Sequence, residues 1–471
     1  MLLVKLFVYV FFSFGFSKSS IAYTEKPNIV FYLADDQDQI DYGVYGNKLI
    51  KTSSIDQLAS EGMLFSNAYT TQAICAPTRS MIYTGLYPMK NGCMANHLPV
   101  KKNLKDVNDF FDELGYEVVL AGKGHVKPNS VFNWTRFFPN ISTDSVQSFS
   151  KKNIPLEKIS SYIKHSKKPF LMFVASDYPH GPYPKNTNYT DEMIFETPYD
   201  KKFPMYNKKG YYKNVESDNN QLKNLLKILD NSKINNNTLF IYAADHGIRG
   251  KWGVSEVGLK IPLIIKWPKF VKPGLVNEGL VNVVDILPTL IEIAGGKASK
   301  ELDGISFKET ILSNKNTERN YVYGISTLQN IMRAKVFPSR SIRNNRYKYI
   351  INYNSIDVYH KNFGENLIIN EFIKIGAESF PEVPFEEFYD LENDPYESNN
   401  LIKKTQYKKE ISILKEQLKK WMISQNDFLI SYKMPLIKPA NFPLDKETRW
   451  NKVDKNLRNT LFDSDYIKLH Y

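Results

Sequence analysis

The clearest pattern along the chain is a series of continuous apolar runs separated by amphipathic segments. Each run ends in a polar or glycine-containing turn, which is typical of a strand buried on both faces of a parallel sheet. The four runs are Asn28–Leu33, Tyr116–Ala121, Pro169–Ala175 and Thr238–Ala243. Helical periodicity predicts helices at Ser54–Glu61, Asp106–Leu114 and Asn219–Leu229. This alternation predicts an α/β domain in which helices cover a large sheet.

The pattern changes after about residue 320. Short aromatic and β-branched runs replace the long apolar ones, and an amphipathic helix follows them. The runs are Tyr321–Tyr323, Ser341–Ile342, Tyr347–Tyr353 and Glu387–Leu391, and the helix is Glu410–Trp421, with Ile411, Leu414 and Leu418 on one face. We therefore expect a smaller C-terminal α+β subdomain over 321–430, with a helix packed on an antiparallel sheet. It follows a larger α/β domain at 23–320 and precedes a polar tail at 431–471.

One polar stretch inside the larger domain has no clear period. Residues 183–212 are rich in Asn, Lys, Tyr and Pro. Irregular segments of this length in a compact domain are usually functional loops. We expect a long loop at the mouth of a site, where it contacts a substrate.

The first 22 residues resemble an export signal. Lys5 supplies a positive charge, Leu6–Phe16 is an uncharged run, and Ser20–Ala22 has the small residues of a cleavage site. The run is too short to span a bilayer, which takes about 20 residues. No cysteine directly follows the cleavage site. We expect an exported protein without a membrane anchor, in a periplasm, a lysosome-like compartment or the outside medium.

The charge balance points to a negatively charged partner. The 471 residues include 62 Lys and Arg against 50 Asp and Glu, a formal net charge of +12. A basic surface concentrates polyanions, and sulfated glycan and nucleic acid are both candidates. A base-composition bias in the gene would give the same excess, so charge alone does not identify the partner.

Charged residues gather directly after the apolar runs. They are Asp35, Asp36, Lys123, His125, His180, Asp245 and His246. Two adjacent carboxylates such as Asp35 and Asp36 repel each other unless a cation neutralises them. Lys123 and His125 lie two positions apart, so their side chains can point the same way. Because sites in open α/β sheets form beyond the carboxyl ends of the strands, these residues predict one shared site.

A cysteine motif lies between the first two runs. The sequence reads Cys75-Ala76-Pro77-Thr78-Arg79 and continues with Ile82-Tyr83-Thr84-Gly85. On its own, Cys-x-Pro usually indicates a small apolar cysteine before a turn. A helix is predicted from Arg79 to Tyr83, ending near Gly85. A helix N-terminus with Arg79 in its first turn suits a bound anion.

The motif resembles the signature of the type I sulfatases. The likeness extends to the acid pair, the Gly-Lys-Gly-His segment, the Pro-His turn, the Asp-His pair, and Lys251 with Glu256. It covers roughly Lys26–Leu429. One departure within the signature is Tyr83, where a more apolar residue is usual. The resemblance implies an alkaline-phosphatase-like fold, with a large mixed sheet sandwiched by helices.

The resemblance also implies a reaction and its cofactors. In this family a formylglycine-generating enzyme oxidises the cysteine, and the hydrated aldehyde is the nucleophile. One divalent metal takes part, here Ca²⁺ with Mg²⁺ as the alternative. The implied metal ligands are Asp35, Asp36, Cys75, Asp245 and His246, and the implied catalytic residues are Cys75, Arg79, Lys123, His125, His180 and Lys251. His246 stands where many members have Asn, and a nitrogen ligand is less typical of calcium.

Within this resemblance, three residues prepare the nucleophile. Arg79 and Lys123 would hold the hydrated aldehyde, and Asp245 would assist its deprotonation. A plain thiol lacks the second hydroxyl that the cycle needs. The chain has two cysteines. If Cys75 becomes formylglycine, Cys93 has no partner, so we expect no disulfide.

Three further residues would move protons. His180 or Lys251 would protonate the leaving alcohol or amine. His125 would then deprotonate the second hydroxyl, which expels sulfate and restores the aldehyde. The implied substrate is a sulfated saccharide and not a nucleic acid.

Three segments resemble the sulfamidase branch of the family, the N-sulfoglucosamine sulfohydrolases. They are Gly122–Pro128, Pro338–Arg343 and Tyr389–Glu397. Two departures are His246, where that branch has Asn, and Lys251, where it has Arg. The segments favour N-desulfation of heparan-type glucosamine, with O-desulfation of another sulfated polysaccharide or ester as the alternative.

Two other functions stay open at this point. Related phosphoesterases use Ser or Thr as the nucleophile and often a second, His-rich metal site, which the 7 His residues supply poorly. If Cys75 stays unmodified, the protein would instead be a non-catalytic binder of polyanions.

Overall fold

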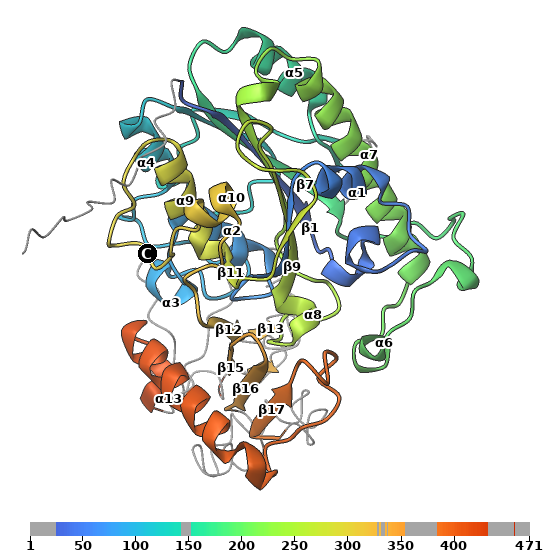
Figure 1. The fold of residues 1–471 in the computed structure, drawn as a ribbon, viewed down its shortest axis with the longest axis vertical. Helices are drawn as coiled ribbons and strands as arrows, with labels where there is room; N and C mark the ends of the chain where they lie inside the picture. The colour runs from blue at the N-terminus through green and yellow to red at the C-terminus, as the bar shows by residue number, and fades with distance from the viewer. Residues whose placement is uncertain are drawn as a thin grey trace, which may run out of the picture.

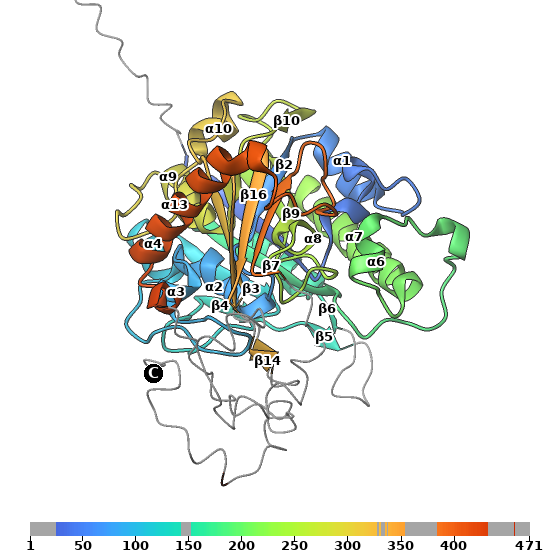
Figure 2. The ribbon, with the colours of Figure 1, turned by 90° about the horizontal axis from the view of Figure 1, so that it is seen from below.

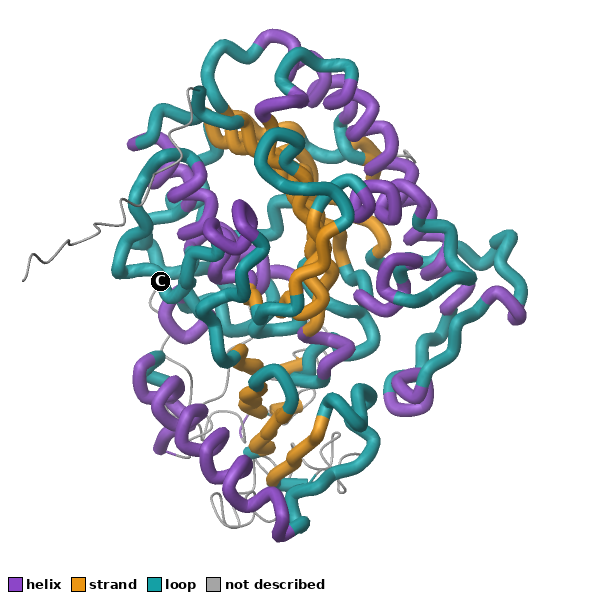
Figure 3. Tube along the Cα trace, in the orientation of Figure 1, coloured by secondary structure: helices purple, strands orange, loops and turns teal. Residues whose placement is uncertain are grey.

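The computed structural model describes residues 25–142, 152–326, 329–330, 335–336, 338–353, 384–431 and 456. The predicted export signal at 1–22 and nearly all of the predicted tail at 431–471 lie outside these residues. In the described part, no helix has the length and apolar character that a membrane span requires. A large sheet runs through the middle with helices on both sides, and a smaller sheet with one long helix lies below it (Figure 1, Figure 3).

The large sheet is mixed, as predicted. Its nine strands are β1 (Asn28–Asp35), β2 (Met63–Tyr69), β3 (Glu117–Gly122), β4 (Arg136–Phe138), β7 (Phe170–Pro179), β8 (Thr238–Ala244), β9 (Lys260–Lys266), β10 (Leu275–Asn277) and β11 (Val281–Asn282). Their order is β10-β2-β9-β8-β1-β7-β3-β4, and β11 pairs with β2. β9 runs antiparallel to both of its neighbours. The central strands β8, β1, β7 and β3 are parallel, so their carboxyl ends lie along one edge.

Alternate residues of the central strands face two different helical layers. Along β1, Ile29 and Phe31 belong to one buried cluster, and Val30 and Tyr32 belong to another. The first cluster includes residues of α2 (Cys75–Thr84), α4 (Val107–Glu113) and α9 (Ile286–Ile293). The second includes residues of α1 (Ser53–Ser60), α5 (Leu156–His165) and α7 (Lys208–Asp230). Because both faces are covered, the central strands are apolar along their whole length.

The loop predicted over 183–212 is shorter than expected. It contains the short helix α6 (Pro198–Lys202), and α7 already begins at Lys208. Asn207 caps α7 by accepting a hydrogen bond from the backbone nitrogen of Gly210 at 2.8 Å. The first turns of α7 contain Gly-Tyr-Tyr, which has a low helix propensity. For this reason the sequence pattern did not predict a helix there. Both tyrosines are buried, and this packing outweighs the propensity.

The remaining elements of the larger domain are short. They are α3 (Pro88–Asn91), β5 (Ile141–Ser142), β6 (Lys152–Asn153), α8 (Glu256–Leu259) and α10 (Lys308–Ser313). Both cysteines are buried free thiols.

The smaller sheet has the antiparallel form predicted for the C-terminal region. Its strands are β12 (Val322–Ser326), β15 (Ser339–Arg343), β16 (Tyr347–Asn352) and β17 (Glu386–Asp390), in that order. The helix α13 (Lys408–Ser424) lies along it and buries Ile411, Leu414 and Leu418 (Figure 2). A two-stranded ribbon of β13 (Gln329–Asn330) and β14 (Lys335–Val336) accompanies it.

Four buried charges join the two parts of the molecule, and we call them the interface cluster: Glu256, Arg343, Lys348 and Glu397. Lys348 of β16 donates to Glu256 of α8 at 3.1 Å and lies 2.7 Å from Glu397. Arg343 of β15 donates to Glu256 at 2.8 Å. Each carboxylate therefore has a cation beside it, as buried charges require.

Candidate active site

Three carboxylates meet where β1 and β8 end, and we call them the acidic triad: Asp35, Asp36 and Asp245. Asp35 is the last residue of β1, and Asp36 follows it with a left-handed φ of 62°. Asp245 directly follows β8, which pairs in parallel with β1. The Asp36 backbone nitrogen donates to Asp245 Oδ1 at 3.0 Å. All three side chains are buried, and each offers an oxygen within 4.8 Å of the others.

The acidic triad fits a divalent cation. Buried carboxylates repel one another unless a positive charge neutralises them. Asp35 Oδ1 is buried and accepts no hydrogen bond from any described residue. Two further donor groups overlap the triad: Cys75 and His246 with Asp36, and Cys75 and His180 with Asp35. Oxygen-rich donors of this kind suit Ca²⁺ and Mg²⁺ alike.

His246 turns one ring nitrogen toward the triad. Its Nδ1 lies 3.1 Å from the carbonyl oxygen of Gly247, so Nδ1 carries a proton in this contact. Its Nε2 lies 3.2 Å from Asp36 Oδ1 and 3.4 Å from Cys75 Sγ. Burial disfavours a charge on the ring, but Asp245, Cys75 and Asp36 raise the pKa of His246 to about 9. A cation held by the triad would take over this charge and leave Nε2 as a ligand.

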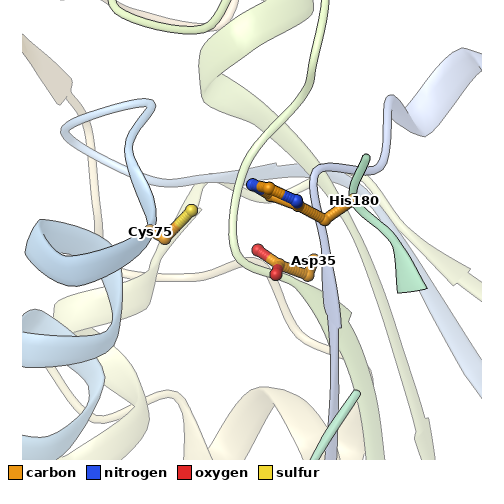
Figure 4. A group of neighbouring side chains, drawn as sticks. All are labelled: Asp35, Cys75 and His180. Atoms are coloured by element: carbon orange, nitrogen blue, oxygen red, sulfur yellow. The ribbon is translucent and has the colours of Figure 1, made fainter. Parts of the chain in front are cut away.

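Cys75 lies opposite the triad at the N-terminus of α2. The helix begins at Cys75 itself, four residues before the predicted start at Arg79. Figure 4 shows the thiol pointing across the site toward Asp35 and His180. The thiol is buried, and Lys251 Nζ lies 3.8 Å from Sγ. Burial and Asp35 raise the pKa of the thiol, but the positive charges of the neighbouring lysines outweigh them and lower it.

Three cations surround the acidic triad: Arg79, Lys123 and Lys251. We call these three cations and the triad together the site cluster. Arg79 is fully buried and donates to Asp245 at 3.2 Å. Lys123 donates to Asp35. Lys251 donates to both carboxylate oxygens of Asp36 at 2.9 Å. The predicted cationic residues therefore converge on the predicted acidic ones.

His180 stands at the open side of the site. Its side chain is 40% exposed, and its Nε2 lies 3.6 Å from Asp36 Oδ2. The turn that carries it is held by α7. The side-chain amide of Asn214 donates to the carbonyl oxygens of Pro179, His180 and Pro182, each at 3.2 Å.

His125 reaches the site less directly than the sequence suggested. Its Nε2 lies 3.2 Å from Nδ1 of a second histidine, His97. Burial, Lys123 and Arg79 lower the pKa of His125 well below its usual range, so the ring is neutral at pH 7. Sequence reasoning missed His97, which lies in a segment without helical or strand periodicity.

Arg249 is a second residue that sequence reasoning missed. It is buried and lies two residues before Lys251. Its guanidinium donates to Asp38 at 2.6 Å, to Asp41 at 2.6 Å and to Asp200 of α6 at 3.1 Å. These contacts fix the loop that carries Lys251. Asp38 and Asp41 lie 211 and 208 positions from Arg249 and Asp200 lies 49 positions from it, so no local pattern could reveal these contacts.

Two models of known protein families match the chain. The sulfatase model matches residues 27–296, which is more than half of the chain. The chain belongs to the sulfatase family. A second model, "N-sulphoglucosamine sulphohydrolase, C-terminal", matches residues 244–362. The predicted family is confirmed, and the protein is a sulfate ester hydrolase.

Relatives and solved structures agree with this assignment. An ulvan-active sulfatase of Formosa agariphila is 45% identical over 465 residues, which cover 96% of this chain and 92% of that sulfatase. A structure solved in complex with its substrate D-glucosamine-2-N,6-O-disulfate has a TM-score of 0.65 at 20% identity, covering 86% of this chain and 99% of that one. A structure in complex with k-i-k-neocarrahexaose has a TM-score of 0.64 at 22% identity, covering 92% and 100%. These two likenesses confirm the predicted fold.

Proposed function

We propose that this sulfatase removes sulfate groups from a polysaccharide of the ulvan type, with Cys75 oxidised to formylglycine as its nucleophile. One observation carries the reaction: Cys75 is buried at a helix N-terminus, opposite the acidic triad and its three cations. A sulfate ester is an anion, and such a site offsets charge that builds during its hydrolysis. The ulvan-active relative, 45% identical over nearly the whole chain, supports the substrate class.

Two groups would supply chemistry that the unmodified side chains lack. Formylglycine, made by a formylglycine-generating enzyme, would place a hydrated aldehyde where the Cys75 thiol stands. A divalent cation held by the acidic triad and His246, beside the modified Cys75, would act as a Lewis acid for the sulfate oxygens. The buried Asp35 Oδ1, which accepts no hydrogen bond from a described residue, is one of the donor atoms available to this cation.

The chain's own cations would bind and orient the sulfate. Burial disfavours a charge on Lys123 and Lys251, but Asp35 and Asp36 raise the pKa of the two amines above the usual value. Both lysines are therefore charged at neutral pH. Arg79, fully buried between two triad members, adds a fixed guanidinium.

We assign the proton donor to the leaving oxygen as His180. Its Nε2 faces the triad, while much of the ring is open to solvent, where a saccharide would enter and leave. Asn214 holds the turn in place, so the ring keeps its position as substrates exchange. Lys251, deeper in the site, is the alternative donor.

A second candidate substrate is N-sulfated glucosamine. The match of residues 244–362 to the C-terminal region of N-sulphoglucosamine sulphohydrolases favours it. However, Arg340 and Arg343 of the similar segment are bound elsewhere. Arg340 donates to Asp427 at 2.6 Å, and Arg343 belongs to the interface cluster. Both serve the packing of the subdomain, so this segment carries little information on the substrate.

Mass spectrometry of the tryptic region around residues 71–90 tests the nucleophile. We expect formylglycine at position 75 in protein from its native host. An unmodified thiol there would leave a non-catalytic binder of polyanions.

A panel of sulfated saccharides tests the substrate. We expect sulfate release from ulvan oligosaccharides, and none from the Cys75→Ala variant. N-sulfated glucosamine and 6-O-sulfated glucosamine are the two comparison substrates. Sulfate release confined to N-sulfated glucosamine would replace ulvan by the second candidate.

We also propose the domain limits 23–320 for the catalytic part and 321–430 for the subdomain, and export directed by residues 1–22. N-terminal sequencing of secreted protein tests the export signal. We expect the mature chain to start at Tyr23.

A further inference from the structure

A chain of polar contacts links the Cys75 helix to His125. Asn96 Oδ1 accepts a hydrogen bond from the Ala76 backbone nitrogen at 3.3 Å. Asn96 Nδ2 lies 3.2 Å from His97 Nε2. His97 Nδ1 in turn lies 3.2 Å from His125 Nε2. Both histidines have left-handed backbones, with φ of 66° and 53°, which persist when the surrounding structure holds them.

The chain of contacts has a direction, because its first atom is a backbone N–H that can only donate. The Ala76 N–H requires the oxygen of the Asn96 amide on its side, so the NH₂ group faces His97. His97 Nε2 must then accept, and a neutral His97 carries its proton on Nδ1. That proton is donated to His125 Nε2. A neutral His125 therefore carries its own proton on Nδ1.

Both rings are neutral near pH 7. Burial, His125 and Lys127 lower the pKa of His97 to about 4. The pKa of His125 is lowered in the same direction by burial and two site cations. His125 Nδ1 is buried, and no described residue bonds to it. A buried N–H without an acceptor is unfavourable, which indicates that a bound group supplies the missing oxygen.

We propose that Asn96 and His97 hold His125 as the Nδ1–H tautomer, so that His125 donates a hydrogen bond to an oxygen of the reacting group. This differs from the role of base that the family resemblance implied for it. Asn96 and His97 act through His125 and are positioning residues. The tautomer follows from the contacts, whereas its part in turnover rests on the proposed function.

The variant Asn96→Asp reverses the direction of the contacts with little change in shape. Its carboxylate still accepts from the Ala76 N–H, but it also accepts from His97, whose proton moves to Nε2. His97 Nδ1 then accepts from His125 Nε2, and His125 Nδ1 loses its proton. A second variant, His97→Gln, keeps an amide donor for His125 and preserves the native tautomer.

Long-range ¹H–¹⁵N spectra of ¹⁵N-histidine-labelled enzyme report which ring nitrogen carries the proton. The His125 signals are assigned by their loss in His125→Gln. We expect a protonated Nδ1 in the native enzyme and in His97→Gln, and a protonated Nε2 in Asn96→Asp. The control is Asn133→Asp, where an exposed side chain gains the same charge.

The kinetic expectation is a fall in kcat of about 10- to 100-fold in Asn96→Asp, the usual effect of disturbing the support of a site residue. The control Asn133→Asp keeps the native kcat. A protonated Nε2 in the native enzyme, or no change in Asn96→Asp, overturns the tautomer. A reversed tautomer with unchanged kcat overturns the donor role. A native Nδ1–H in an enzyme that releases no sulfate from any saccharide refutes the proposed function and leaves the tautomer standing.

Discussion

The site cluster and the interface cluster are both groups of buried charge, but their carboxylates are arranged differently. In the interface cluster, Lys348 lies 3.1 Å from one carboxylate and 2.7 Å from the other. Against the effect of burial, Lys348 and Arg343 lower the pKa of Glu256 to about 2. In the site cluster, against the effect of burial, the neighbouring lysines Lys123 and Lys251 likewise lower the pKa of Asp35 and Asp36, respectively. Asp245 differs, because burial and neighbouring Asp35 raise its pKa to about 7, against the effects of His246 and Arg79.

The site cluster brings three carboxylates to one point, whereas the interface cluster contains two carboxylates that share Lys348. The Glu256 carboxylate of the interface cluster is more stable as an anion in the fold than in the unfolded chain. The three triad carboxylates each place an oxygen within 4.8 Å of the others. The interface cluster holds two parts of the fold together. The site cluster gathers carboxylate oxygens from three residues around one point, which is what a site for a divalent cation requires.

The largest expected effect concerns the nucleophile. Cys75→Ala should lower kcat by about 10⁴- to 10⁶-fold, since the reaction has no other nucleophile of this kind. The urea midpoint should change little, because the substitution removes only the sulfur atom of one small side chain. Sulfate release and urea unfolding of the same preparation check both statements. Residual activity within tenfold of the native enzyme would contradict the role of Cys75.

The next effect concerns the cation. Removal of divalent metal with a chelator should slow turnover by about 10³-fold, which corresponds to several kcal/mol of lost charge stabilisation. Ca²⁺ or Mg²⁺ added back should restore the rate, and the circular dichroism spectrum should be unchanged throughout. Full activity after exhaustive chelation would show that the triad does not need a cation.

The third test disturbs the interface cluster. Lys348→Met leaves two buried carboxylates with less compensation and should destabilise the fold by about 3–5 kcal/mol. The kcat of the folded fraction should be unchanged. Lys415→Met is the matched control. Lys415 pairs with Glu386 on the surface, 42% exposed, and its loss should cost less than about 1 kcal/mol. Equal urea midpoints for the two variants would abolish the distinction between the clusters.

The smallest effect is a pH dependence of the interface cluster. The folded pKa of Glu256 is about 2, below the 4.5 of an ordinary Glu. As the pH falls, the unfolded chain therefore binds this proton first, and the stability present above pH 4.5 is lost between about 4.5 and 2. Glu256→Gln should flatten this part of the stability curve. Urea unfolding between pH 6 and pH 3 measures it, and parallel curves for both proteins would count against the pairing.

The sequence predicted the parts of the molecule that local pattern controls. The central strands are buried on both faces, so each is a continuous apolar run. The charged residues after those runs converge because parallel strands end at one edge. For this reason Asp35, Lys123 and Asp245 could be placed in one site from their positions alone.

What the sequence could not reveal depends on contacts between distant segments. The first turns of α7 form because two tyrosines are buried, although their local propensity is low. His97 matters through His125, 28 positions away, and Arg249 through carboxylates on two other segments. Such partners have no signature in spacing or composition.

The ion pair between Asp200 and Arg249 has a consequence for how this enzyme can diversify. It connects α6, in the surface segment expected to meet the saccharide, to the loop that carries Lys251. An exchange of that segment for another would remove a support of the lysine as well as reshape the entrance. A change in this segment would therefore affect both the substrate range and the turnover rate. A segment transplanted from another sulfatase should include a carboxylate that can pair with Arg249.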